Sequence, residues 1–335
     1  MSDAPRRPTV ADVAREAGTS TAVVSYVVNN GPRHVTDATR ARVERAIATL
    51  NYRRNSLAGA LSVGRSNLVG LLVPDSSNAF FSELARHIES EARSHGYLTV
   101  LGNTNYDRVV ERGYETAFAD LQAAGVFVVT IDPQPPIDDH TPRVYLHSTP
   151  AGGSPSSVIC DDEAGARLAV EHLVSHGHTE IHCITGPHDF GPSGHRMAGW
   201  VSAMRDAGLP TADLLHRVSM DRIEAEIALR EMLAEAMPPA FFATTDEHAL
   251  ALMRAASQAG VRIPEDAAII GFDGIREALL GSVRLTTVAL PLAEMARKAF
   301  EHLDGWSKGA EQFPTVLAPA LVIGETCGNH DTTDP

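Results

Sequence analysis

Long apolar runs are missing from this chain of 335 residues. No stretch approaches the roughly 18 consecutive apolar residues that cross a bilayer. The polar N-terminus, residues 1–5, also lacks the apolar segment of an export signal. We therefore expect a protein that makes no membrane contact and stays in the cytoplasm.

Cysteine is scarce as well. Cys160, Cys183 and Cys327 are odd in number and far apart, which excludes a fully paired disulfide framework. Their spacing does not resemble that of metal ligands either. We expect three buried thiols in a reducing compartment.

Patterns that carry catalysis or bind metal are also lacking. No nucleophile stands in a recognisable pattern with a base, no Gly-rich phosphate loop is found, and Ser193-Gly194 is ordinary loop composition. His172 and His176, four residues apart on one predicted helix, have a spacing that can share a zinc ion, and His178 follows them. No third ligand has a matching spacing. We expect no enzyme activity, no cofactor and no metal.

What the chain does contain is an uneven charge. Its formal net charge is −14, yet residues 1–65 hold ten arginines and five acidic residues, a net of +5. The remaining residues carry −19. A basic segment ahead of an acidic body suits a protein that binds nucleic acid with one end only. The length predicts two or three folded units.

The basic segment has the pattern of two short helices joined by a tight turn. Thr9 can cap the first helix with Asp12 as its capping-box partner, and Gly18 can end it. Ser20 can cap the second helix, whose apolar stripe is Val23, Val24, Val27 and Val28. This spacing favours a helix-turn-helix, whose second helix can enter a DNA major groove. An ordinary helical hairpin in a core is the alternative.

A third helix is expected at 37–50, capped by Thr36, with a basic face of Arg40, Arg42 and Arg45. Residues 51–66 follow and are too short and too rich in Gly and Ser to hold a helix in isolation. The whole run resembles the headpiece and hinge of the LacI/GalR family of bacterial transcription regulators. The matching pieces are V-A-D-V-A-x-x-A-G, S-x-A-x-V-S, V-x-N, T-R-x-R-V, L-x-Y-R-x-N and A-x-x-L.

The resemblance implies a helix-turn-helix headpiece at 1–50 and a hinge helix at 51–65, acting on palindromic operator DNA as a homodimer or a tetramer. The second helix would face base edges, with Tyr26 where the family often has an arginine; a tyrosine cannot make the two-pronged contact of arginine with guanine. Leu61 would wedge between central base pairs. The expected DNA-binding residues are Thr9, Ser20, Thr21, Ala22, Ser25, Tyr26, Asn29, Arg40, Asn55, Leu57, Ala58 and Leu61.

Residues 66–335 alternate apolar strands with amphipathic helices, which predicts parallel sheets covered by helices on both faces. Strands are expected at 68–73, 98–101, 126–131, 144–146, 158–160, 181–185, 241–243 and 268–272, and helices at 80–95, 111–123, 163–176, 195–207 and 247–259. The pattern resembles the α/β periplasmic-binding-protein-like core of the same family, which has two Rossmann-like lobes. The first lobe would hold about 66–158 and 291–318, and the second about 161–288 and 321–335.

Ligands of such sheets bind at the carboxyl ends of strands. Positions at strand ends and matches to family motifs together predict an effector site for a small molecule, a sugar or related metabolite, made of Phe80, Phe81, Asn103, Arg196, Thr245, Asp246 and Asp273. The alternatives are core packing for the two phenylalanines and a surface ion pair for Arg196. Thr245, Leu290 and Gly324 replace the Asn, Gln and Arg common in the family, which predicts a smaller or less polar effector.

The connection at 132–142 is unusually short and contains four prolines, so we expect one helix of the first lobe to be missing. The function that the resemblance implies is a transcriptional regulator, a repressor associated with the nucleoid. Two alternatives are a solute-binding protein without a DNA role and a sugar-modifying enzyme on a Rossmann-like fold. The missing export signal and the basic headpiece disfavour the first, and the missing catalytic pattern disfavours the second.

Overall fold

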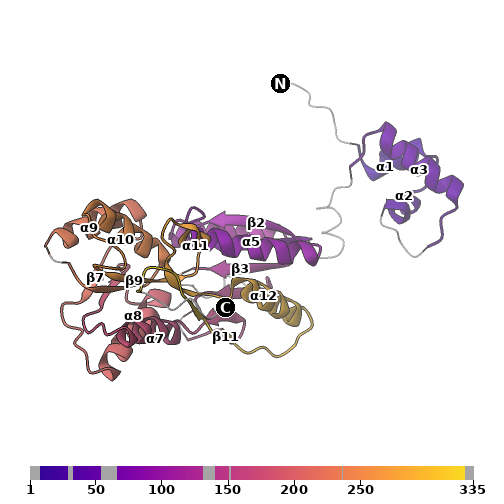
Figure 1. Cartoon of the computed structure of the whole chain (residues 1–335). Coiled ribbons are helices and arrows are strands. Elements are labelled where there is room, and N and C mark those ends of the chain that lie inside the picture. The colour runs from indigo at the N-terminus through magenta and orange to yellow at the C-terminus, as the bar shows by residue number, and fades with distance from the viewer. Residues whose placement is uncertain are drawn as a thin grey trace. The chain divides into compact units, whose positions relative to one another are not determined.

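Two units, Met1–Ser66 and Asn67–Pro335, make up the chain (Figure 1). The computed structural model describes residues 8–28, 33–53, 66–130, 140–150, 152–235 and 237–328. Most of the predicted hinge helix therefore lies outside the described residues.

The first unit contains three helices, α1 (Val10–Glu16), α2 (Thr21–Val28) and α3 (Asp37–Thr49). The predicted capping box is confirmed, since the Thr9 N–H donates to Asp12 Oδ2 at 2.9 Å and the Asp12 N–H donates to Thr9 Oγ1 at 3.4 Å. Ser20 caps α2 through a 3.3 Å bond from the Val23 N–H. The three helices enclose a small apolar core of Val13, Ala14, Ala17, Val24, Val27, Val43 and Ala46.

The second unit contains two six-stranded sheets, which confirms the predicted pair of Rossmann-like lobes. The first sheet has the order β11-β5-β4-β3-β1-β2, and the second has the order β12-β10-β9-β8-β6-β7. Among the described strands, every neighbouring pair is parallel except β10 and β12.

The strands of the first sheet are β1 (Leu68–Val73), β2 (Leu98–Asn103), β3 (Gly125–Val129), β4 (Arg143–Leu146), β5 (Ser157–Cys160) and β11 (Thr315–Leu317). Those of the second are β6 (His182–Thr185), β7 (Leu215–Arg217), β8 (Ala240–Ala243), β9 (Ala268–Asp273), β10 (Thr286–Ala289) and β12 (Ala320–Val322).

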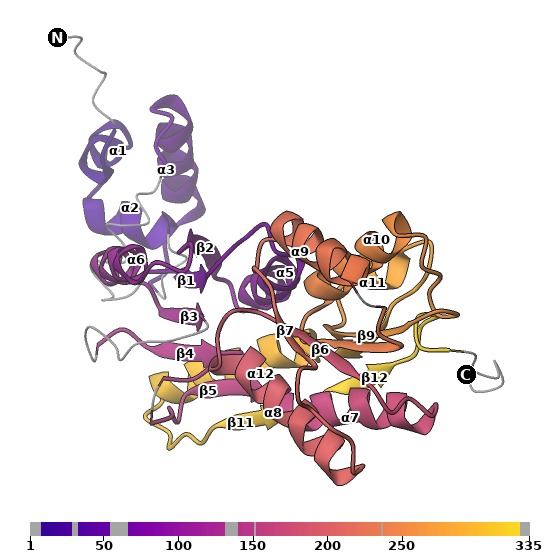
Figure 2. The same cartoon turned by 90° about the vertical axis from the view of Figure 1, so that its left-hand side faces the viewer.

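Helices cover both faces of each sheet. In the first lobe, α5 (Ala79–Ser94) packs with α12 (Leu292–Ser307) on one face, and α6 (Arg108–Asp120) contacts β1 and β2 from the other. In the second lobe, α9 (Arg222–Glu235) and α10 (Asp246–Gln258) lie on one side of the sheet, and α7 (Asp162–Ser175) and α8 (Gly191–Asp206) on the other (Figure 1, Figure 2). The short α11 (Arg276–Leu280) follows β9.

Two helices begin earlier than the apolar periodicity indicates. Helix α6 starts at Arg108 because the Asp107 carboxylate caps it, accepting from the Val109 and Val110 N–H groups at 2.7 and 3.3 Å. Helix α8 starts at Gly191, with a proline in its first turn where no N–H is needed.

The chain passes between the lobes three times. It leaves the first sheet after β5, returns from β10 through α12, and passes from β11 of the first sheet to β12 of the second. The predicted effector residues lie at or after the carboxyl ends of β1, β2, β6, β8 and β9. Strands β3 and β4 are parallel neighbours, and residues 131–139 of the short connection between them lie outside the described residues.

Candidate DNA-binding helix and ligand site

Helix α2 exposes one face and buries the other. Thr21, Ala22 and Ser25 are exposed, whereas Val24 and Val27 belong to the headpiece core, and Tyr26 is half-buried beside the exposed face. This division is what a recognition helix needs, because the apolar stripe fixes its orientation and the polar face is left for a partner.

Other predicted DNA-binding residues surround that face. Thr9 and Ser20 are exposed residues that also cap α1 and α2, and Arg40 is half-buried on α3. The Arg42 Nε donates to the Ala17 carbonyl at 3.3 Å, which ties α3 to α1. Asn29, Asn55, Leu57, Ala58 and Leu61 lie outside the described residues.

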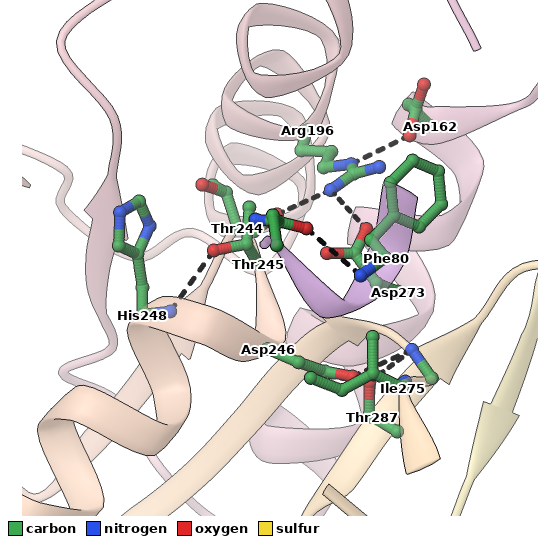
Figure 3. A network of polar contacts seen from close by, with 12 residues as sticks. Phe80, Asp162, Arg196, Thr244, Thr245, Asp246, His248, Asp273, Ile275 and Thr287 are labelled. Atoms are coloured by element: carbon green, nitrogen blue, oxygen red, sulfur yellow. Dashed lines mark hydrogen bonds and ion pairs between the residues drawn. The ribbon is translucent and has the colours of Figure 1, made fainter. Parts of the chain in front are cut away.

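Arg196 is the centre of a buried polar network in the core (Figure 3). Arg196 is only 1% exposed to solvent. The Nε donates to Asp162 Oδ1 at 2.7 Å, and Nη1 donates both to Asp273 Oδ1 at 2.9 Å and to the Thr244 carbonyl at 2.7 Å. The guanidinium also lies 3.8 Å from the centroid of the Phe272 ring. The alternative of a surface ion pair is therefore wrong, because Arg196 joins α7, α8 and the ends of β8 and β9 inside the core.

Three buried carboxyl groups lie in this region, and two of them, Asp162 and Asp273, accept hydrogen bonds from Arg196. Burial raises the pKa of Asp273 to about 8, against the opposing effect of Arg196, and raises the pKa of Asp162 as well. Burial also raises the pKa of Asp246 to about 6, a smaller rise because Thr287, Ile275 and Gly274 donate to its ionised form. Within the described part of the chain, Arg196 Nη2 has no hydrogen-bond partner. The network thus offers a buried hydrogen-bond donor and carboxyl groups whose pKa values are raised.

Thr245 and Asp246 hold the local backbone. Thr245 caps α10, since its hydroxyl accepts from the His248 N–H at 3.2 Å. Asp246 accepts from the Thr287 hydroxyl at 2.6 Å and from the N–H groups of Gly274 and Ile275 at 2.8 and 2.9 Å. Much of the hydrogen-bonding capacity of both side chains is used in this way. Their contact with an effector remains a prediction.

The effector residues predicted in the first lobe do not all lie next to the Arg196 network. Phe80 lies beside Arg196 and Asp273 (Figure 3), and its ring is buried, as is that of Phe81. This burial fits both ligand contact and the alternative of core packing. Asn103 instead shapes a loop, accepting from the Ser76 N–H and donating to Asn105 Oδ1, both at 2.9 Å.

His147 is a candidate that the sequence analysis missed. It directly follows β4, its ring centroid lies 4.6 Å from that of Phe80, and its φ of 69° is left-handed. Burial, together with the charge of Arg196, holds the pKa of His147 well below its ordinary value, so the imidazole is neutral. Its Nδ1 has no hydrogen-bond partner among the described residues. Its place at the end of a predicted strand was the signal that could have found it.

Gly324 explains one of the departures from the family pattern. A Cβ built at this position would lie 2.3 Å from the Arg284 carbonyl oxygen and 2.6 Å from the Leu285 carbonyl carbon. Both neighbours are backbone atoms, so an arginine cannot stand here without a shift of the chain. Leu290, the second departure, is buried.

The predicted burial of the three thiols is confirmed, because Cys160, Cys183 and Cys327 are all buried. His172 Nε2 lies 3.4 Å from Cys327 Sγ. Within the described ranges, no three His, Cys, Asp or Glu side chains are grouped so that they could hold a metal ion. None of the helices described there is both long and apolar enough to cross a bilayer.

Known families match both units of the chain. Residues 9–55 match the model of bacterial regulatory proteins, lacI family, and residues 170–327 match the periplasmic binding protein-like domain. The transcriptional repressor PurR of Vibrio parahaemolyticus is 33% identical over 328 residues, covering 95% of this chain and 98% of PurR. The ribose operon repressor of Escherichia coli K12 is 34% identical over 303 residues, covering 88% and 92%.

Solved structures agree with this assignment. The Lac repressor dimer bound to operator and the anti-inducer ONPF superposes with a TM-score of 0.83 at 26% identity, covering 96% of this chain and 99% of that one. The complex of the transcriptional regulator CelR with cellobiose gives a TM-score of 0.70 at 27% identity, covering 96% and 100%. With its headpiece, its two-lobed core and relatives above 30% identity along nearly their whole length, this chain belongs to the lacI family of bacterial regulatory proteins.

Proposed function

We propose that this protein is a sequence-specific DNA-binding repressor of transcription whose operator affinity is changed by a small molecule held between the two lobes. The observation that carries the proposal is its similarity to PurR and to the ribose operon repressor through both headpiece and core. A solute-binding protein needs no headpiece. The relatives are repressors, which disfavours the enzyme alternative. Its place of action is the nucleoid of the cytoplasm.

The headpiece supports the DNA side of the proposal. The exposed face of α2 would read base edges, with Thr21, Ala22 and Tyr26 nearest the bases. Ser20, Ser25 and Arg40 would contact phosphates, which fix the register without reading sequence. The net charge of +5 in residues 1–65 supplies the attraction to DNA that does not depend on sequence.

An exposed apolar surface supports a homodimer. Strand β2 is an edge strand of the first sheet, and Leu98, Val100 and Leu101 on it are 61%, 37% and 44% exposed. Val109 and Val110 at the start of α6 are 80% and 37% exposed. An apolar edge of this kind favours pairing with another chain. Two headpieces on one dimer would bind a palindromic operator.

The Arg196 network supports the effector side. The free Nη2 of Arg196 could donate to a ligand oxygen, Asp273 could exchange hydrogen bonds with hydroxyl groups, and the neutral imidazole of His147 could do so from the first lobe. These groups suit a compact hydroxylated molecule such as a sugar, with the Phe80 ring as an apolar wall. The ligand can change operator affinity only through unequal affinity for two arrangements of the lobes.

Selection of DNA from a random duplex pool by the full chain tests the proposal. The expected result is an enriched inverted repeat. Replacing Tyr26 with Phe should change the base preference at one position in each half-site of the inverted repeat. Arg40→Ala should instead weaken binding to all sequences. A pool without any enriched motif would support the solute-binding alternative instead.

A further inference from the structure

Two glutamates reach from one lobe to the other and cap a helix there. Glu83 on α5 of the first lobe accepts a 2.7 Å hydrogen bond from the N–H of Arg276, the first residue of α11 in the second lobe. Glu247 on α10 of the second lobe accepts a 3.2 Å bond from the N–H of Ala79, the first residue of α5. The contacts are reciprocal, since each lobe supplies one carboxylate and one helix N-terminus.

The chemistry of helix ends favours both contacts. The first N–H groups of a helix have no partner within the helix and carry a partial positive charge, so a carboxylate is a favourable acceptor. In α5 the local cap Asn78 accepts from the Phe80 N–H at 3.0 Å, and Ala79 donates to Glu247. In α11 the N-cap residue is Ile275, which has no side-chain acceptor. The other lobe thus supplies an additional acceptor for α5 and the side-chain acceptor that the N-cap residue of α11 lacks.

The two carboxylates differ in how firmly they are held. Glu247 is buried, and the guanidinium of Arg222 on α9 contacts its second oxygen. Glu83 is half-buried and lines an open groove between α5 and α11, together with Arg86 and Leu280. Water can therefore compete for the Glu83 contact, although its hydrogen bond is the shorter of the two.

Both contacts adjoin the candidate effector site. The N–H groups of Gly274 and Ile275 donate to Asp246, and the next N–H, that of Arg276, donates to Glu83. This turn directly follows Asp273, and Ala79 directly precedes Phe80. Arg196 and Asp273 are only 1% and 4% exposed, so a ligand reaches them only when the lobes separate. Separation breaks the hydrogen bonds that join Glu83 and Glu247 to the opposite lobe.

We propose that Glu83 and Glu247 form a two-point interlobe latch, which stabilises the closed arrangement of the lobes and sets how often the ligand site opens. The latch is a property of the two lobes themselves. Only the role of the entering ligand as an effector rests on the proposed function. In this role both glutamates are positioning residues. Their loss would change effector affinity without removing any contact to the effector.

Hydrogen exchange of the full chain, without DNA or ligand, tests the latch. We expect Glu83→Ala and Glu247→Ala each to speed amide exchange around both Ala79 and Arg276. An increase of about tenfold at either place would correspond to about 1.4 kcal/mol. The diagnostic effect is the indirect one, namely faster exchange at Ala79 after Glu83→Ala and at Arg276 after Glu247→Ala. Increases confined to the directly capped N–H would overturn the latch and leave two independent caps.

Matched variants keep the test decisive. Glu89→Ala changes another glutamate of α5, whose ion pair is with Arg93 of the same helix, and should leave both segments as in the wild type. Should an alanine variant fail to fold, Glu83→Gln and Glu247→Gln retain the acceptor oxygen but lose the charge, and should give smaller increases at both places. Wild-type exchange in both glutamine variants would contradict the latch. Selection of operator DNA by the same variants reports on the proposed function separately.

Discussion

Arg196 has a structural role besides any contact with a ligand. Its guanidinium donates hydrogen bonds to two buried carboxyl groups that come from elements far apart in the sequence, Asp162 at the start of α7 and Asp273 at the end of β9. Removing one partner of a buried ion pair leaves an uncompensated charge in a medium of low polarity. A substitution here would therefore affect folding as well as the response to an effector.

We expect Arg196→Met to lower the free energy of unfolding of the core by about 3–5 kcal/mol. Urea denaturation at neutral pH measures this loss. The control is Arg167→Met on α7, where the ion pairs with Asp206 and Glu171 are more exposed, and the expected loss is below about 1 kcal/mol. Equal losses in the two variants would show that the Arg196 network does not stabilise the core.

Asp273 should make the stability of the core depend on pH. With its pKa raised to about 8, Asp273 stays protonated in the folded protein over a range where the unfolded chain has lost that proton. The folded state then binds more protons, so the contribution of this residue to stability falls as pH rises from about 4 to about 8.

Asp273→Asn removes that titration and keeps an acceptor for Arg196. Urea denaturation at pH 5, 6, 7 and 8 should show the variant gaining stability relative to the wild type as the pH rises. The comparison cancels the buried histidines His147 and His248, whose lowered pKa values act in the opposite direction in both proteins. A difference that does not change with pH would mean that Asp273 is ionised throughout this range.

At the scale of helices and strands, two glycines give opposite predictions. Gly113 lies in α6 with nothing within 4 Å of a built Cβ, whereas a Cβ at Gly324 would meet the backbone of Arg284 and Leu285. Gly113→Ala should raise the free energy of unfolding by about 0.5–1 kcal/mol, through the smaller entropy loss of alanine in a helix. Gly324→Ala should lower it by about 1–3 kcal/mol, because the backbone must shift.

Thermal unfolding of both variants under the same conditions checks this pair of predictions. A stable Gly324→Ala protein would show that the segment after β12 is free to move. In that case the lack of an arginine at this position would need another explanation.

Regular elements were predictable wherever one short pattern determined them. The capping box of Thr9 and Asp12 and the alternating strands and helices of the core depend on neighbours within a few residues, so periodicity and caps revealed them. The three-residue edge strands β7 and β11 have too few residues for a pattern. Helix α6 was placed too late because the cap Asp107 precedes the apolar stripe.

The candidate site was less predictable, because its contacts join distant parts of the chain. Family motifs pointed to Arg196 and Asp273, but no local pattern shows that Asp162, 34 residues away from Arg196, lies 2.7 Å from it. Nor did the sequence reveal that Asp246 supports the turn of Gly274 and Ile275. His147 was missed although the strand before it was predicted.

At the scale of the whole molecule, charge and apolar surface are placed separately. The net charge of +5 lies in residues 1–65, while the rest of the chain is strongly acidic and would be repelled by DNA phosphates. The exposed apolar residues of β2 and α6 belong to the second unit, Asn67–Pro335. This division suits a molecule that pairs through its core and binds DNA through two headpieces.

Pairing and DNA recognition can be measured together. The most direct test is the binding isotherm of the full chain on its selected inverted-repeat duplex and on the same duplex with one half-site scrambled, at several salt concentrations. We predict two chains on each intact duplex, an affinity at least about 100-fold lower after scrambling, and a linear fall of log affinity with log salt. A chain that binds as a monomer, with equal affinity for both duplexes, would contradict the account.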